Sequence, residues 1–436
     1  MVLIWDGTEI PWRSACSAFA CAFAFRMFIP DVRLESTRPA LPISSLVPFI
    51  YRHSKLIDLL GSVTYFHASE DRDDRDRIFA LIGLADDAGP LRADYTLTVG
   101  ETYACALKHI IQSSQKLRAL AYVSHHGLTM NDGIPTWAPD WKEAGCARLA
   151  SMGNFAASGV SSARWQDSED WDTLSLAGLM QDRVKAVKFA PDVNALTSEF
   201  LLEVFQLAMD NKCSEPVKQM VWTITAGHAN SWLMAGQSGK SDKVSTSDPE
   251  HLQNFMACLH DRLAYDWCVS KPGRCLRQSL ALIDAALDAL PPHYRNIDRS
   301  DMPEYYGHES FESLIRKAHS FDATVADTAM QGLNRVRRTH NTQKAGPFLH
   351  QLEVAVTWRA CFVTNDGIMG LGPAWMAEGD VICILFGGST PYVLRPTGSD
   401  GEFHFIGECY VYGIMDGEAM TEYENGEVTE TWFHWK

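Results

Sequence analysis

The residues of this sequence that are best suited to chemistry stand near its C-terminus, between Gly413 and Ala419. Asp416 and Glu418 are two positions apart, and Gly413 and Gly417 allow the backbone to turn sharply around them. Two carboxylates on such a turn can face one site and act there as a general acid and a general base. The alternative is an acidic turn whose oxygens accept backbone N–H groups.

Two tyrosines precede this turn. Tyr410 and Tyr412 alternate with Val411, so they share one face of a predicted strand. A phenol that points into a cavity donates a hydrogen bond at neutral pH. We therefore predict that Tyr410, Asp416 and Glu418 are catalytic and that Tyr412 contacts the substrate.

A second group lies in Trp137-Ala138-Pro139-Asp140-Trp141, where two indoles flank a proline that cannot sit inside a helix. Trp137 and Trp141 can wall an apolar pocket for a hydrophobic substrate, or they can anchor the loop to the core. Asp140 can act as a further catalytic base with a raised pKa, or it can bind nearby N–H groups. Arg77 can bind an anionic part of the substrate, or it can belong to an ion-paired helix start.

Motifs that would hold a cofactor or a metal are missing from the sequence. There is no Gly-x-x-x-x-Gly-Lys-Ser/Thr loop, and Gly370-Leu371-Gly372-Pro373 lacks the third glycine and the following helix of a dinucleotide site. No His-Glu-x-x-His pair or Gly-x-Ser-x-Gly elbow occurs. We therefore expect no cofactor and no metal.

Charge and composition limit the partners. The net charge is −16, and no Lys/Arg run is longer than Arg337-Arg338, which argues against nucleic acid and anionic membranes as partners. The apolar run from Ala15 to Phe25 is too short to span a bilayer, so we expect no membrane insertion. The 11 cysteines form no Cys-x-x-Cys pair, which is typical of reduced thiols in a cytoplasmic protein.

Hydrophobic patterning predicts the elements that position these residues. Helices are expected over 12–28, 48–60, from 73 and from 96, with a strand over 174–179. Between 195 and 345 the i, i+3, i+4 recurrence predicts helices at 200–208, 276–290 and 311–321. After 358, short β-forming runs separated by Asn-Asp-Gly, Gly-Gly and Ser-Asp-Gly predict hairpins.

These patterns predict an α+β protein of three parts. Residues 1–190 form an α/β segment, 191–345 a helical region, and 346–436 a small antiparallel sheet or partial barrel. We expect the C-terminal sheet to pack back on the first part.

Three blocks of the sequence resemble the fungal heterokaryon-incompatibility (HET) domain family, in the family's order. They are Arg75 to Leu84 with Asp94-Tyr95 and Tyr103, the block Ile134 to Trp141, and the C-terminal run from Phe362 to Gly413. The N-terminal core of that family, with its Y-x-x-L-S-Y-x-W-G stretch, is not found. The chain therefore resembles a truncated family member that lacks this core, which another protein could supply.

The resemblance leaves two functions open. HET proteins are associated with fungal allorecognition and cell death, which implies a signalling or interaction protein without catalysis. The missing core is the part that resembles nucleotide-hydrolysing domains, so that activity is not expected. The abundant aromatic residues instead predict a cofactor-independent enzyme of fungal specialised metabolism, such as a cyclase or isomerase that performs an intramolecular cycloaddition on a terpenoid or polyketide.

Overall fold

The computed structural model describes residues 2–5, 8–11, 55–65, 73–123, 133–141, 148–152, 155–166, 168, 170–190, 198–229, 243–269, 276–289, 317, 324, 345–399 and 401–435. It begins with a hairpin of β1 (Val2–Trp5) and β2 (Thr8–Pro11). Helices and a nine-stranded sheet follow, which confirms the predicted α+β class. The helices expected at 12–28 and, apart from residue 317, at 311–321 lie outside the described residues.

The first group of helices consists of α3 (Leu56–Tyr65), α4 (Asp76–Ile82), α5 (Val99–Ser114), the 3-10 helix η2 (Arg118–Tyr122) and the short α6 (Leu149–Met152). Helix α5 begins at a capping box. The Thr98 hydroxyl accepts from the Glu101 N–H at 3.2 Å, and the Glu101 carboxylate accepts from the Thr98 N–H at 2.7 Å. The buried Tyr103 hydroxyl donates to the Asp74 carbonyl at 2.9 Å, which ties α5 to the start of α4.

Replacement of Thr98 by alanine removes the oxygen that binds the first turn of α5. We expect Thr98→Ala to lower the free energy of unfolding by about 1 kcal/mol. Thr98→Ser keeps the oxygen and should retain most of that stability. Urea unfolding of the two variants checks this, and equal losses in both would show that the cap does not stabilise α5.

The long strand β4 (Leu174–Phe189) organises the sheet. It pairs antiparallel, along successive parts of its length, with β11 (Glu430–Trp435), β7 (Val381–Leu385) and β5 (Arg359–Thr364). Register shifts between Met180 and Asp182 and between Val184 and Ala186 increase its bend, so one strand serves both parts of the sheet. A Cβ at Gly178 would lie 2.4 Å from the Ile384 carbonyl oxygen, so this crossing requires glycine.

Five strands close into a barrel. From β4 the order runs through β11, β9 (Glu402–Glu408), β8 (Tyr392–Pro396) and β7, and β7 pairs again with β4. The pair β11 and β9 is parallel. Beyond β4 the sheet continues through β5 to β6 (Met369–Pro373) and β10 (Tyr410–Val411), and β3 (Trp165–Gln166) also pairs with β4. This confirms the predicted partial barrel.

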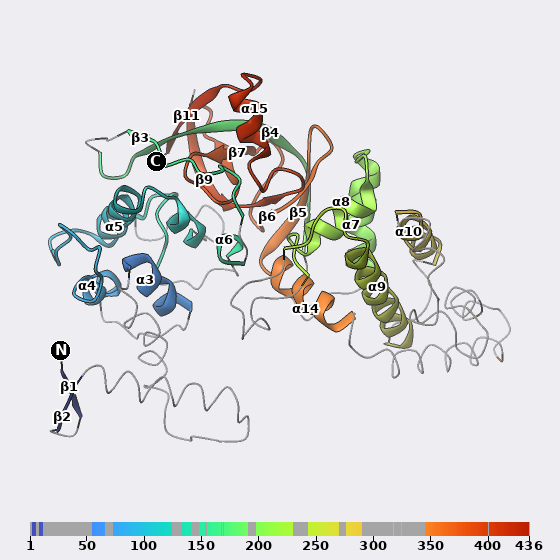
Figure 1. Ribbon diagram of the computed structural model, residues 1–436, viewed down its shortest axis with the longest axis horizontal. Helices are drawn as coiled ribbons and strands as arrows, with labels where there is room; N and C mark the ends of the chain where they lie inside the picture. The colour runs from blue at the N-terminus through green and yellow to red at the C-terminus, as the bar shows by residue number, and fades with distance from the viewer. Residues whose placement is uncertain are drawn as a thin grey trace.

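The barrel packs on the first group of helices, as expected (Figure 1). Side chains of all five barrel strands and of α3, α4 and α5 belong to one hydrophobic cluster. Its members include Leu56, Ile78, Tyr103, Leu176, Cys383, Leu394, Phe405 and Phe433. Burial of this continuous apolar surface holds the helices against the barrel.

The predicted helical middle consists of α7 (Ser198–Asp210), α8 (Pro216–Ile224), α9 (Pro249–Val269) and α10 (Leu276–Ala289), and α14 (Ala345–Val356) leads back to the sheet. These helices lie beside β5 and β6, on the opposite side of the molecule from α3 to α5 (Figure 1). A second hydrophobic cluster joins them to the sheet, with members such as Phe200, Trp222, Phe255, Phe348, Val363 and Leu371.

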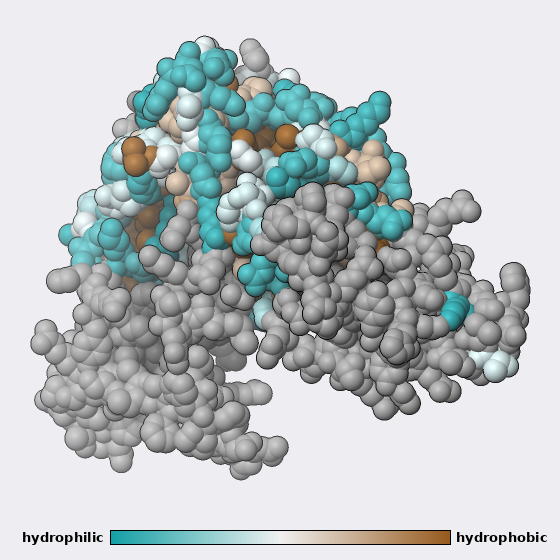
Figure 2. Space-filling model, turned by 45° about the vertical axis from the view of Figure 1, so that its right-hand side comes forward, coloured by the Kyte–Doolittle hydropathy of each residue, from teal (hydrophilic) through white to brown (hydrophobic). Residues whose placement is uncertain are grey.

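Within the described ranges, no helix combines the length and the apolar character needed to cross a membrane. On the face shown in Figure 2, the described residues are mostly hydrophilic and small hydrophobic areas lie between them.

Candidate functional site

A cavity of about 370 Å³ lies between the end of α8, the segment that starts at residue 243 and the turn after β10. Its floor is formed by Gly227 and by buried side chains of Trp222, Val244, Tyr410 and Met415. Its rim consists of exposed residues, namely Lys243, Ser245, Thr246, Gly413, Asp416 and Glu418. This volume is in the range of small-molecule sites, and the cavity combines an apolar floor with a polar rim.

Three of the four predicted catalytic residues, Tyr410, Asp416 and Glu418, line this cavity. The turn that carries the carboxylates has positive φ at Gly413 and Gly417. The Glu418 carboxylate accepts from the Asp416 N–H at 2.7 Å, at the start of helix α15 (Glu418–Glu424). Glu418 therefore accepts a backbone N–H, as the alternative predicted, and also lines the cavity, whereas the catalytic roles of Tyr410, Asp416 and Glu418 stay predictions.

The Asp416 carboxylate forms an ion pair with the Lys243 ammonium at the rim. The same ammonium lies over the Phe155 ring, 5.3 Å from its centroid. Both charged groups are at least partly exposed, so the pair positions the rim more than it stabilises the fold.

Tyr410 carries a hydroxyl group on the cavity floor, and only 4% of its surface is exposed. Among the described residues its hydroxyl has no hydrogen-bond partner. Burial raises the pKa of Tyr410, and Tyr412 and the two carboxylates of the rim raise it further. The phenol is therefore protonated at neutral pH and can donate to an acceptor in the cavity.

Gly227 leaves the space beside this phenol free. Its φ is +70°, and a Cβ there would lie 3.3 Å from the Tyr410 hydroxyl. The Gly227 N–H donates to the Trp222 carbonyl at 2.8 Å, which completes the turn at the end of α8. The Trp222 indole N–H in turn donates to the Val244 carbonyl at 3.4 Å, so the two walls of the cavity are joined.

Two histidines are fully buried, His228 after α8 and His251 in the first turn of α9. The His251 ring packs against Trp222, which lines the cavity. His228 Nδ1 is 2.7 Å from the Ala226 carbonyl, and His251 Nε2 is 3.0 Å from the Thr225 hydroxyl. The other nitrogen of each ring is buried without a partner among the described residues. Burial lowers the pKa of both to about 4, so both rings are neutral at neutral pH.

Tyr412 is half-buried and does not line the cavity. Burial raises its pKa, whereas the nearby Lys218 ammonium lowers it. Its predicted contact with a substrate stays a prediction.

The two indoles of the Trp137–Trp141 segment lie in the cluster between the barrel and α3 to α5. Trp137 is completely buried, and its indole N–H donates to the Asp172 carbonyl at 2.9 Å. Trp141 packs against Tyr122, with ring centroids 5.2 Å apart, and its carbonyl accepts from the Arg77 guanidinium at 3.3 Å. These contacts agree with the alternative that the indoles anchor the loop.

Asp140 is half-buried in the same segment, and Arg77 is buried in α4. Neither described cavity is lined by Asp140, Arg77, Trp137 or Trp141. The structure therefore places these four candidates apart from Tyr410, Asp416 and Glu418, and their catalytic or binding roles stay predictions.

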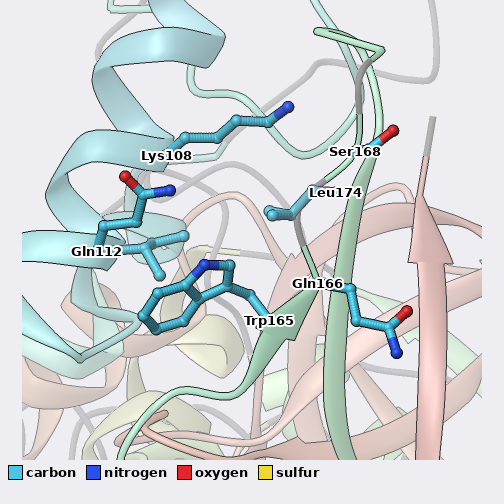
Figure 3. A pocket seen from close by; sticks show the side chains of 7 residues that line it. Lys108, Gln112, Trp165, Gln166, Ser168 and Leu174 are labelled. Carbon is cyan, nitrogen blue, oxygen red and sulfur yellow. The ribbon is translucent and has the colours of Figure 1, made fainter.

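A second, smaller cavity of about 40 Å³ lies between α5 and β3. Figure 3 shows Leu174 opposite Lys108 and Gln112 of α5, and Trp165 below them. Its volume is about that of one or two water molecules, so it cannot hold an organic ligand.

The sequence patterns did not identify Lys243, Gly227 or Trp222 as parts of a site. Lys243 and Gly227 border a polar stretch that reads as an ordinary loop, and Trp222 belongs to a helical apolar pattern. Only the pairing of distant segments places them beside Tyr410. Within the described part of the chain, no group of three or more His, Cys, Asp or Glu side chains could hold a metal ion.

The fold and the cavity define an α+β protein with a barrel-like C-terminal sheet and a small-molecule-sized cavity at its edge. Residues 299–428 match the family model of the Het-6 beta-barrel domain. Over 382 residues the chain is 21% identical to heterokaryon incompatibility protein 6, OR allele, of Neurospora crassa; the match covers 79% of this chain and 48% of the relative. No solved structure matches the chain.

The chain is therefore similar to heterokaryon-incompatibility proteins of fungi, in line with the resemblance of the three sequence blocks. It spans about half the length of the relative that it matches. Strands β4 and β11 lie outside the matched range 299–428, although they complete the closed barrel.

Proposed function

We propose that this protein acts in heterokaryon incompatibility or a related fungal self/non-self response, as a cytoplasmic signalling or interaction protein. The observation that carries the proposal is the match over 79% of the chain to a heterokaryon incompatibility protein, together with the Het-6 barrel domain. Because the match covers 79% of the chain, it extends beyond residues 299–428, which match the barrel domain.

Inducible expression in a filamentous fungus tests this proposal. Expression of the intact chain is expected to arrest growth or kill hyphal compartments, measured by colony extension and a viability dye. A matched strain that expresses the Trp137→Ala variant, whose core is disrupted, should grow normally. Unaffected growth at verified expression of the intact chain would contradict the proposal.

A second candidate is the cofactor-independent cyclase or isomerase. It is supported by the cavity that gathers Tyr410, Asp416 and Glu418, since a phenol donor aimed at a carbonyl can stabilise developing negative charge and the cavity floor can hold a flexible substrate in a reactive shape. Gene deletion with metabolite profiling separates the two functions. Catalysis is favoured if the deletion strain accumulates an intermediate and a strain that expresses Tyr410→Phe accumulates the same intermediate. An unchanged metabolite profile in the deletion strain would exclude catalysis.

A further inference from the structure

The Tyr410 hydroxyl is the group in the cavity that is best placed to form a hydrogen bond with a ligand. The side chain is more than nine-tenths buried, lines the cavity and has no hydrogen-bond partner among the described residues. The hydroxyl opens toward the cavity, so its hydrogen-bonding capacity is available to a molecule bound there. An acceptor oxygen on a bound molecule would supply that partner.

The charges at the rim indicate the other end of such a molecule. Two carboxylates, Asp416 and Glu418, face one ammonium, Lys243, and this ammonium is already paired with Asp416. Glu418 engages the Asp416 N–H through one oxygen, Oε2. The second oxygen of Glu418 and the net negative rim therefore favour a cation, and the net charge of −16 adds to this preference.

We propose that the cavity binds a small organic cation that carries a protonated amine and a carbonyl oxygen on an apolar body. The amine would bind Glu418, the oxygen would accept from Tyr410, and the body would pack on Trp222 and Met415. This site goes beyond the role in incompatibility. The proposed binding site is the same cavity that would serve the cyclase or isomerase, but binding requires no chemical turnover. Ligand binding can therefore fail while the growth assay supports a role in incompatibility, and ligand binding can succeed while the growth assay fails.

Isothermal titration of the full chain tests the proposal with two probes. Kynuramine has an aryl ketone and a primary amine, whereas benzoylpropionate has an aryl ketone and a carboxylate. Kynuramine is expected to bind at least tenfold more tightly. Equal or tighter binding of benzoylpropionate, or no heat of binding with kynuramine at millimolar concentration, would overturn the proposal.

Three variants with matched controls locate the binding. Tyr410→Phe and Glu418→Gln should each weaken kynuramine roughly tenfold, whereas Glu424→Gln on the same helix should not. Gly227→Ala should also weaken kynuramine binding, because the added methyl group fills the space beside the Tyr410 phenol. Gly379→Ala is the control, since Gly379 has a similar positive φ but open space around it, and this variant should bind kynuramine as the wild type does. Circular dichroism confirms that each variant is folded, and full affinity in Glu418→Gln would overturn the assignment of the cation site.

Discussion

Between pH 6.5 and pH 4, His228 and His251 are each expected to remove about 3 kcal/mol from the free energy of unfolding. Both pKa values fall from 6.5 to about 4 on folding, chiefly because burial penalises the charged ring. In this pH range the unfolded chain binds more protons than the folded chain. Stability is therefore complete above pH 6.5 and is lost as the pH falls toward 4.

The contacts of the two rings explain why protonation is unfavourable. His228 donates from Nδ1 to a carbonyl, so the added proton would go to Nε2, which has no partner among the described residues. The Thr225 hydroxyl donates to the Val221 carbonyl at 2.9 Å, so it accepts from His251 Nε2 and leaves Nδ1 to take the proton without a partner.

Urea unfolding at a series of pH values measures this effect. His228→Asn and His251→Gln keep an amide in place of the bonded ring nitrogen and should flatten the slope below pH 6.5. His350→Gln, at a partly exposed histidine, is the control substitution. Burial raises the pKa of Glu408, so this carboxyl group changes stability with pH in the direction opposite to the histidines. The slope of each variant is therefore compared with the slope of the wild type. Equal slopes in all four proteins would contradict the prediction.

Replacement of Trp137 by alanine is expected to lower the free energy of unfolding by about 3–5 kcal/mol. The indole is completely buried, its N–H binds the Asp172 carbonyl, and the Lys108 ammonium lies 5.4 Å from its ring centroid. Alanine removes these contacts and leaves a cavity between the loop and α5. Equilibrium unfolding in urea measures the loss.

Two further variants identify the cause. Trp137→Phe keeps most of the volume and should lose only about 1–2 kcal/mol, mainly the hydrogen bond to Asp172. Trp171→Ala, at an indole that is 38% exposed, should lose less than Trp137→Ala. If Trp137→Ala were as stable as wild type, the segment would not anchor the loop, and the pocket-wall alternative for Trp137 would gain support.

Local sequence signals predicted many elements correctly. The helix expected from residue 96 is α5, which begins at Val99, and the helix expected over 276–290 is α10. The Asn-Asp-Gly and Gly-Gly turns separate strands of the sheet. Strand β6 was not predicted, because Met369-Gly370-Leu371-Gly372-Pro373 has a weak strand pattern and is stabilised by its buried neighbours. Gly370 is needed there, since a Cβ would meet the Phe362 ring at 2.2 Å and the Tyr410 carbonyl oxygen at 2.6 Å.

By itself the sequence determined the mixed class, the hairpins of the C-terminal sheet, the HET-like blocks and the acidic turn that carries Asp416 and Glu418. Only the tertiary structure decided that β4 and β11 close the barrel, and that the end of α8 and Lys243 lie beside Tyr410. The physical reason is the separation along the chain of the residues that interact. Caps, turns and periodicity depend on neighbours within a few positions, whereas strand pairing and a cavity depend on packing between segments far apart in the chain.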